Sequence, residues 1–158
     1  MDVQAIFGVQ FLLSLVVWGL IATWLLGPWL AKKSHHEALF WLTLPHAFRH
    51  IGLVFLVPGL VAQPLPEGFA NPAAYGDLLA GVLALLALIA LRAGWSGALV
   101  VVWVFNIVGA VDLLNALRHV NVAPGFGATW FIPTFFVPLL LITHVMIFIR
   151  LLQRRDAS

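Results

Sequence analysis

The sequence predicts an all-α integral membrane protein with a single transmembrane helical domain over residues 1–158. The chain is 63% hydrophobic and only 9% charged, whereas a soluble domain of this size carries about a quarter charged residues. Its apolar runs are continuous for about 20 residues, the length that a spanning helix needs. Strands of a membrane barrel would instead alternate with polar residues over about 10 positions. The solvent of most of the chain is therefore lipid, and the elements in it are helices.

Breaks rich in proline, glycine or charge divide the apolar sequence into five spans. The first break is Gly27-Pro28 with the polar residues after it, and the second is the proline-rich stretch from Gln63 to Pro72. The other two breaks run from Arg92 to Ser96 and from Arg118 to Ala128. The expected spans are about Ala5–Leu26, Ala38–Val61, Tyr75–Leu91, Gly97–Leu117 and Thr129–Leu151.

The distribution of charge predicts how these spans are oriented. Five spans place the two termini on opposite sides of the membrane, which puts six basic residues on one side: Lys32, Lys33, Arg92, Arg150, Arg154 and Arg155. The other side then carries Asp2, Glu67, Asp77 and Arg118. Because cytoplasmic loops are enriched in Lys and Arg, we expect an N-out, C-in protein of a bacterial-type inner membrane. The alternative is four spans with a re-entrant third run.

Polar residues in the middle of the second span are the first mark of a functional site. His46, Arg49 and His50 lie where a span is deepest, and a charge there costs roughly 2.5–3.5 kcal/mol. Together with Thr43 they are spaced by three or four residues, which places them on one face of an α-helix. Such residues persist in lipid where they pair, line a wet cavity or bind a ligand. Pro45 is expected to kink the helix beside His46.

The fourth and fifth spans carry matching polar positions. A stripe of residues three apart on the fourth span comprises Asn106, Gly109, Asp112 and Asn115, and His144 lies on the fifth. A rise of about 1.5 Å per residue puts His46 and His144 at similar depth. The third span has no polar residue between Leu78 and Leu91. We therefore expect spans one, two, four and five to form a polar-cored bundle, with the third span peripheral.

These positions form one set of candidate ligand-binding residues, and the arginine in this set, Arg49, has two alternative roles. In one role Arg49 faces an anion or a carboxyl-bearing ligand; in the other it forms a structural ion pair with Asp112, because an unpaired buried arginine is hard to tolerate. The histidines would orient the ligand or relay protons. The candidate ligand-binding residues are His46, Arg49, His50, Asn106, Asp112, Asn115 and His144.

The same histidines could hold a cofactor. Two histidines from different helices at one depth suit a b-type haem clamped between His46 and His144. Alternatively His46, His50 and His144 could ligate one metal ion. The sequence shows no phosphate-binding loop and no hydrolase, kinase or protease motif, and whether the protein is an enzyme stays open at this point.

Three functions remain open at this point. The leading one is a small polytopic protein that binds or translocates a small solute or protons. The second is a haem- or metal-binding redox protein, and the third is an accessory subunit of a larger membrane complex whose polar cluster is purely structural. The expected partners are the lipid bilayer and a small-molecule or ion ligand, with a second copy of the chain or another subunit left open. The pI of 9.7 reflects the membrane orientation rather than a nucleic-acid partner.

Overall fold

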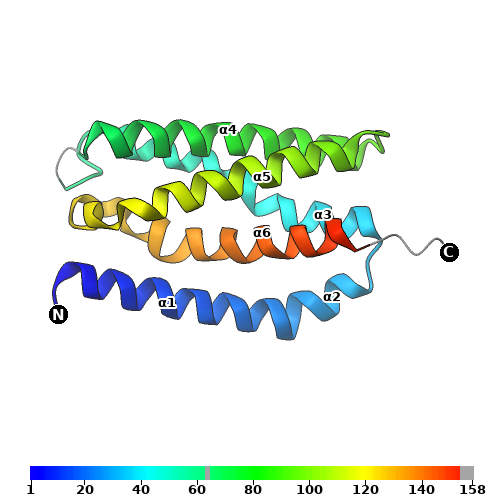
Figure 1. Cartoon of the computed structure of the whole chain (residues 1–158), viewed down its shortest axis with the longest axis horizontal. Coiled ribbons are helices and arrows are strands. Elements are labelled where there is room, and N and C mark those ends of the chain that lie inside the picture. The colour runs from blue at the N-terminus through cyan, green and yellow to red at the C-terminus, as the bar shows by residue number, and fades with distance from the viewer. Residues whose placement is uncertain (63–64, 154–158) are drawn as a thin grey trace.

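The computed structural model describes residues 1–62 and 65–153. Within them five helices are long and apolar enough to cross a membrane: Val3–Ala31, His35–Leu56, Glu67–Arg92, Ala98–His119 and Gly127–Leu152. The helices run alongside one another, and α1 begins at the end of the molecule opposite to the end of α6 (Figure 1). The described part contains no strand. The prediction of an all-helical, multi-pass membrane protein is confirmed.

The first span continues past the expected break at Gly27-Pro28. Helix α1 (Val3–Ile21) is capped by Asp2 and is followed by a π-helical turn, η1 (Ala22–Leu26), and by α2 (Gly27–Ala31). In η1 the N–H of Gly27 bonds to the carbonyl of Ala22, five residues earlier. This wider turn accommodates a proline, which cannot donate a backbone hydrogen bond, so the helix does not stop there.

The second span changes helix type at its proline. Helix α3 (His35–Thr43) is capped by the side chain of Ser34 and passes into η2 (Leu44–Leu56), a 3-10 helix of 13 residues. Pro45 lies in the first turn of η2. The segment ends at Val57, whose extended backbone is the conformation favoured before a proline, here Pro58.

The third and fourth spans are regular α-helices. Helix α4 (Glu67–Arg92) begins eight residues before the predicted Tyr75, and α5 is Ala98–Ala116. Pro72 lies inside α4, where we expected a loop. Because this proline falls within the first two turns, it removes one backbone bond near the helix start without ending the helix.

The fifth span starts with short turns and then becomes regular. After η3 (Leu117–Gly125) the chain forms η4 (Gly127–Trp130), the π-helical turn η5 (Ile132–Phe136) and α6 (Val137–Leu152). Pro133 lies in the π-helical turn η5, and Pro138 follows it at the start of α6. In the same way, Pro28 follows the π-helical turn η1 of the first span. In both places a wider turn relieves the loss of a backbone donor.

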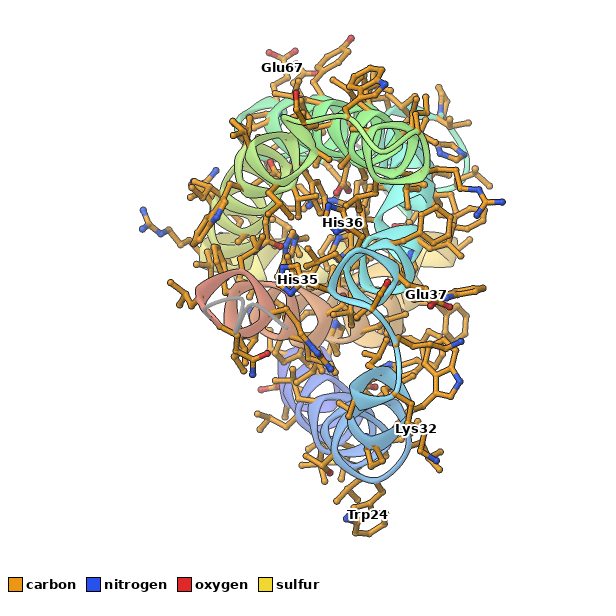
Figure 2. The ribbon with its side chains drawn as sticks, turned by 90° about the vertical axis from the view of Figure 1, so that its right-hand side faces the viewer. Trp24, Lys32, His35, His36, Glu37 and Glu67 are labelled. Carbon is orange, nitrogen blue, oxygen red and sulfur yellow. The ribbon has the colours of Figure 1, made fainter. Side chains whose placement is uncertain are left out.

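Helix α4 lies inside the bundle, and the expectation that the third span is peripheral is wrong. Half of its most apolar stretch is buried, against 11% for the first span. The alanines Ala80, Ala84 and Ala87 are fully buried. Because their side chains are small, α4 can approach η2 and α5 closely. Seen along the bundle, α1 and α2 lie at the outer edge, with Trp24 directed away from the other helices (Figure 2).

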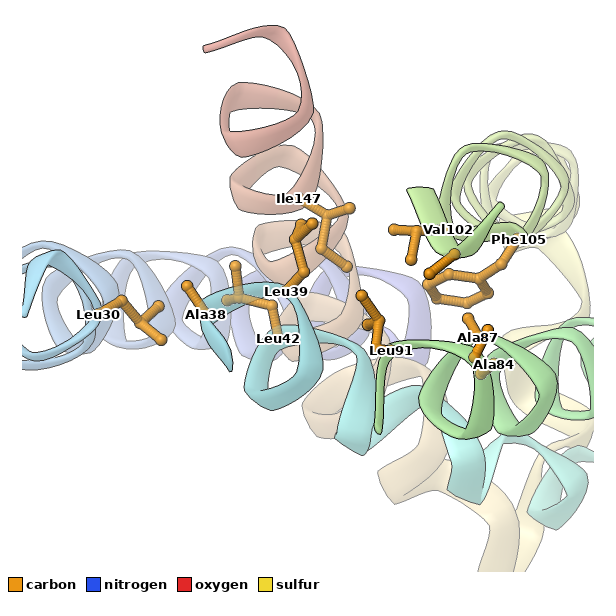
Figure 3. Packing of buried hydrophobic residues seen from close by; sticks show 12 residues of the cluster. Leu30, Ala38, Leu39, Leu42, Ala84, Ala87, Leu91, Val102, Phe105 and Ile147 are labelled. Atoms are coloured by element: carbon orange, nitrogen blue, oxygen red, sulfur yellow. The ribbon is translucent and has the colours of Figure 1, made fainter. Parts of the chain in front are cut away.

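A hydrophobic cluster fills the interior of the bundle at one end. Leu39 and Leu42 of α3 pack here with Leu91 of α4, Phe105 of α5 and Ile147 of α6 (Figure 3). The smooth alanine face of α4 meets Val102 and Phe105 in the same cluster. This apolar packing fixes the positions of η2, α4, α5 and α6 around the polar residues deeper in the bundle.

Candidate functional site

The geometry of η2 determines which polar side chains of the second span face inward. The buried residues from the end of α3 through η2 are spaced by three: Thr43, His46, Arg49, Gly52 and Phe55. A 3-10 helix has 3.0 residues per turn, so positions i and i+3 lie on one line. His50, four residues after His46, is turned away and exposed, with its Nδ1 3.0 Å from the carbonyl of Ala47. The structure therefore does not bring His50 to the site.

Arg49 is the centre of a buried ion cluster, the Arg49 group, formed with Asp77 and Asp112. Its Nε donates to Oδ1 of Asp77 at 2.7 Å, and its Nη2 donates to Oδ2 of Asp112 at 2.5 Å. Nη1 donates to the carbonyl of Gly109 at 2.9 Å. Arg49 is only 1% exposed. The expected Arg49–Asp112 ion pair is thus formed, and a second carboxylate joins it.

Asp77 is the site residue that sequence reasoning missed. It was assigned to the outer end of the third span because that span was expected to start at Tyr75. Since α4 starts at Glu67, Asp77 is almost three turns into the helix at about 3.6 residues per turn. Its spacing from Ala80 and Ala84 places it on the same buried face as these alanines. That spacing was the signal in the sequence that could have found it.

Glycines make room for the Arg49 group. A Cβ on Gly76 would collide with the carboxylate of Asp112, and one on Gly52 would collide with that of Asp77. A Cβ on Gly109 would lie 2.8 Å from Nη1 of Arg49. Since a side chain at any of these positions would displace a charged group, the glycines are part of how the cluster is assembled.

His46 and His144 form a second buried group, the histidine pair. Their ring centroids are 4.1 Å apart with an interplanar angle of 54°, which confirms the expectation that the two residues share one depth. Nε2 of His46 lies 2.9 Å from Oγ1 of Thr143. Nδ1 of His144 lies 2.7 Å from Oδ1 of Asn106, whose Nδ2 donates to the carbonyl of His144 at 3.2 Å.

The spacing of the two rings bears on the cofactors expected from the sequence. In a bis-histidine haem the porphyrin lies between the two rings, and rings whose centroids are 4.1 Å apart leave no room for it. A haem clamped by His46 and His144 therefore does not fit this arrangement. Among the described residues, no three histidine or carboxylate side chains gather as metal ligands, so the site expected from His46, His50 and His144 is not assembled.

A cavity of about 40 Å³ adjoins the carboxylates of the Arg49 group. Asp77 and Asp112 line it together with His119, and its other walls are apolar. Four phenylalanines from different parts of the chain contribute to these walls: Phe7, Phe55, Phe69 and Phe126. Their rings pack against one another, with centroids 5.7–6.0 Å apart in four contacts among these phenylalanines. The result is a small cavity lined by phenylalanine rings and by the carboxylates of Asp77 and Asp112.

The remaining candidate of the fourth span lies outside the Arg49 group. Asn115 is exposed, and its carbonyl lies 3.2 Å from Nδ1 of His119. Both residues line a second, smaller hollow beside Asp112. His119 thus borders both spaces, whereas the side chain of Asn106 is fully buried beside His144.

Comparisons with known proteins place the chain in a family without assigning a function. No curated protein matches it, and no solved structure does. The matching family model covers residues 6–152, which include both polar groups and all but the first three residues of the five spans. The chain belongs to this family, which is described as a domain of unknown function, DUF8737.

Proposed function

We propose that this protein binds a proton or a small cationic solute at the Arg49 group and passes it through the membrane. The observation that carries the proposal is the charge of this group. One guanidinium faces two carboxylates, Asp77 and Asp112, which leaves one negative charge in a largely buried place. A buried charge without a partner is unfavourable, and a proton or a cation bound beside the carboxylates would neutralise it.

The bonding of Arg49 argues for a cation over an anion. The sequence allowed Arg49 to receive an anionic or carboxyl-bearing ligand. In the structure its Nε, Nη1 and Nη2 all donate to groups of the same chain, and two of these groups are carboxylates. An anionic ligand would have to displace one of them. The carboxylates, in contrast, line the cavity and can meet a solute there.

Proton and cation flux in liposomes tests this proposal. Purified protein in vesicles with an internal pH indicator is given a pH step, and the variants Asp77→Asn and Asp112→Asn are compared with wild type. We expect wild-type vesicles to equilibrate faster than empty vesicles and both variants to lose this difference. His50→Ala, which changes an exposed histidine of the span that carries Arg49, is the control. If no cation or proton moves faster than in empty vesicles, the proposal fails.

A structural role in a larger membrane complex is the second candidate, and one observation favours it. All three side-chain nitrogens of Arg49 have hydrogen-bond partners within the chain, so the Arg49 group can hold η2, α4 and α5 together. In that case Arg49→Met combined with Asp77→Leu and Asp112→Leu should give a folded protein that still co-purifies with its partner from native membranes. Retained flux in wild-type vesicles that lack the partner would contradict this role.

The orientation is proposed from the charges at the two ends of the bundle. Lys32 and Lys33 lie between α2 and α3, and Arg92 and Arg150 lie near the ends of α4 and α6, which share one end of the molecule (Figure 1). We propose that this end faces the cytoplasm of a bacterial-type cell. Because the chain has no cysteine, single cysteines at exposed Ser96 and Asn121 can test it. An impermeant maleimide should label Asn121→Cys and spare Ser96→Cys; the reverse pattern would invert the orientation.

A further inference from the structure

The hydrogen bonds around the histidine pair identify where the protons of both rings lie. Oγ1 of Thr143 donates its only proton to the backbone carbonyls of Leu139 and Leu140, so it accepts the proton of His46 Nε2. The amide nitrogen of Asn106 donates to the carbonyl of His144, so Oδ1 of Asn106 faces His144 Nδ1 and accepts from it. In their neutral forms, His46 carries its proton on Nε2 and His144 carries its proton on Nδ1.

The other nitrogen of each ring is then a bare hydrogen-bond acceptor. Nδ1 of His46 and Nε2 of His144 have no hydrogen-bond partner among the residues that the structure describes, and neither has Oγ1 of Thr43. These residues are 0–2% exposed. A buried polar atom left without a partner costs about 1–3 kcal/mol. A small molecule with N–H or O–H donors would satisfy such a nitrogen.

The Arg49 group lies next to the histidine pair and restricts what this molecule can be. A Cβ on Gly109 would lie 2.8 Å from Nη1 of Arg49 and 3.0 Å from Nε2 of His144, so the guanidinium and this imidazole both lie against the same glycine. A metal ion on the histidines would be repelled by Arg49. A neutral hydrogen-bond donor would not.

The cavity beside the carboxylates of Asp77 and Asp112 restricts the size and charge of the solute that can bind there. At about 40 Å³, it holds roughly three molecules the size of water. Aromatic rings such as those in its walls attract cations, and its two carboxylates accept N–H donors. A small cation with N–H groups meets all of these conditions.

We infer that the solute is ammonium, with methylammonium as a larger congener; the inference rests on the proposed function and names its solute. Ammonium enters the cavity and donates to the carboxylates of Asp77 and Asp112. One carboxylate takes a proton, so that NH₄⁺ and COO⁻ become NH₃ and COOH. The neutral ammonia then donates its N–H groups to Nδ1 of His46 and Nε2 of His144. The proton stays on the carboxylate until it is released or returned.

Wild-type protein alone provides the first test. Proteoliposomes adsorbed on a solid-supported membrane are given a step of ammonium chloride or of potassium chloride at constant pH, and the charge displaced is recorded. Potassium is close to ammonium in size and has no proton to donate. We expect the ammonium signal to exceed the potassium signal by about tenfold, the equivalent of one hydrogen bond of about 1.4 kcal/mol. Equal signals would overturn ammonium as the solute and leave a cation-binding protein.

The histidine variants provide the second test. His144→Gln keeps a side chain that can bond to Asn106, and His46→Phe keeps a flat ring; the unfolding temperature of each shows whether it folds. We expect the ammonium signal to fall about tenfold relative to the response to a pH step in each variant, by the same equivalence, and to be unchanged in His50→Ala. A proportional fall of both responses would overturn the role of the histidine pair. A response to pH without any response to ammonium would overturn the inference alone, whereas no response to any cation would also overturn the proposed function.

Discussion

The Arg49 group and the histidine pair are neighbours, and they differ in how completely their hydrogen bonds are formed. Every nitrogen of Arg49 has a partner within the chain. Each histidine has one bonded nitrogen and one nitrogen without a partner among the described residues. A cluster in which every arginine nitrogen is bonded contributes to holding helices together, whereas a pair with unused acceptors leaves a capacity for binding. The difference separates a polar group that also holds helices together from one whose free acceptors contribute to binding alone.

Removing the charge of Arg49 should have the largest effect on stability. Arg49→Met leaves Asp77 and Asp112 facing each other without a counter-charge. Breaking a buried ion pair by removing one partner costs about 3–5 kcal/mol, so we expect a large fall in the free energy of unfolding in mild detergent. Adding Asp77→Leu and Asp112→Leu should recover most of this loss. An Arg49→Met protein as stable as wild type would show that the Arg49 group does not support the fold.

A methyl group at Gly109 should disturb both polar groups at once. The Cβ of Gly109→Ala would lie 2.8 Å from Nη1 of Arg49 and 2.8 Å from Cε1 of His144. Overpacking of this kind costs about 1–3 kcal/mol, measurable as a lower unfolding temperature. Gly8→Ala is the control, since a Cβ at Gly8 meets no other atom within 4 Å. Equal unfolding temperatures for both variants would contradict the close approach at Gly109.

Loss of the Asn106 side chain should act on the histidine pair alone. Asn106→Leu removes the acceptor of His144 Nδ1–H and a donor to the backbone of α6. Hydrogen bonds between membrane helices contribute about 0.6–2 kcal/mol, so we expect a loss within this range. The nitrogen NMR spectrum of labelled histidine should show His144 protonated on Nδ1 in the wild type and a mixture of tautomers in the variant. A wild-type His144 protonated on Nε2 would contradict the assigned network.

Replacement of His46 should have the smallest effect on stability. His46→Phe removes a nitrogen that has no partner among the described residues, and Thr143 keeps its bonds to the carbonyls of Leu139 and Leu140. Removing an unsatisfied polar atom offsets the loss of the bond to Thr143, so we expect a change below about 1 kcal/mol in the free energy of unfolding. A destabilisation as large as that of Arg49→Met would place the histidine pair among the structural parts of the core.

Much of the fold could be predicted from the sequence because lipid imposes a simple rule on composition and length. Five apolar runs gave five spans, and depth along the helices correctly paired His46 with His144 and Arg49 with Asp112. Asp77 was missed because the start of α4 depends on whether the chain tolerates Pro72 in its first turns. His50 was included because the spacing was read for an α-helix, and a long 3-10 helix is stabilised by tertiary packing that no local pattern reveals.

The 3-10 conformation of η2 ties the inward face of the second span to a period of three residues. In an α-helix, positions three apart are separated by about 300° of rotation, so the line from Thr43 to Phe55 would drift by about 60° at each step. Arg49 and Phe55 could not then both face the interior. An insertion or deletion of a single residue there would turn every later side chain of η2 by about 120°, to another face.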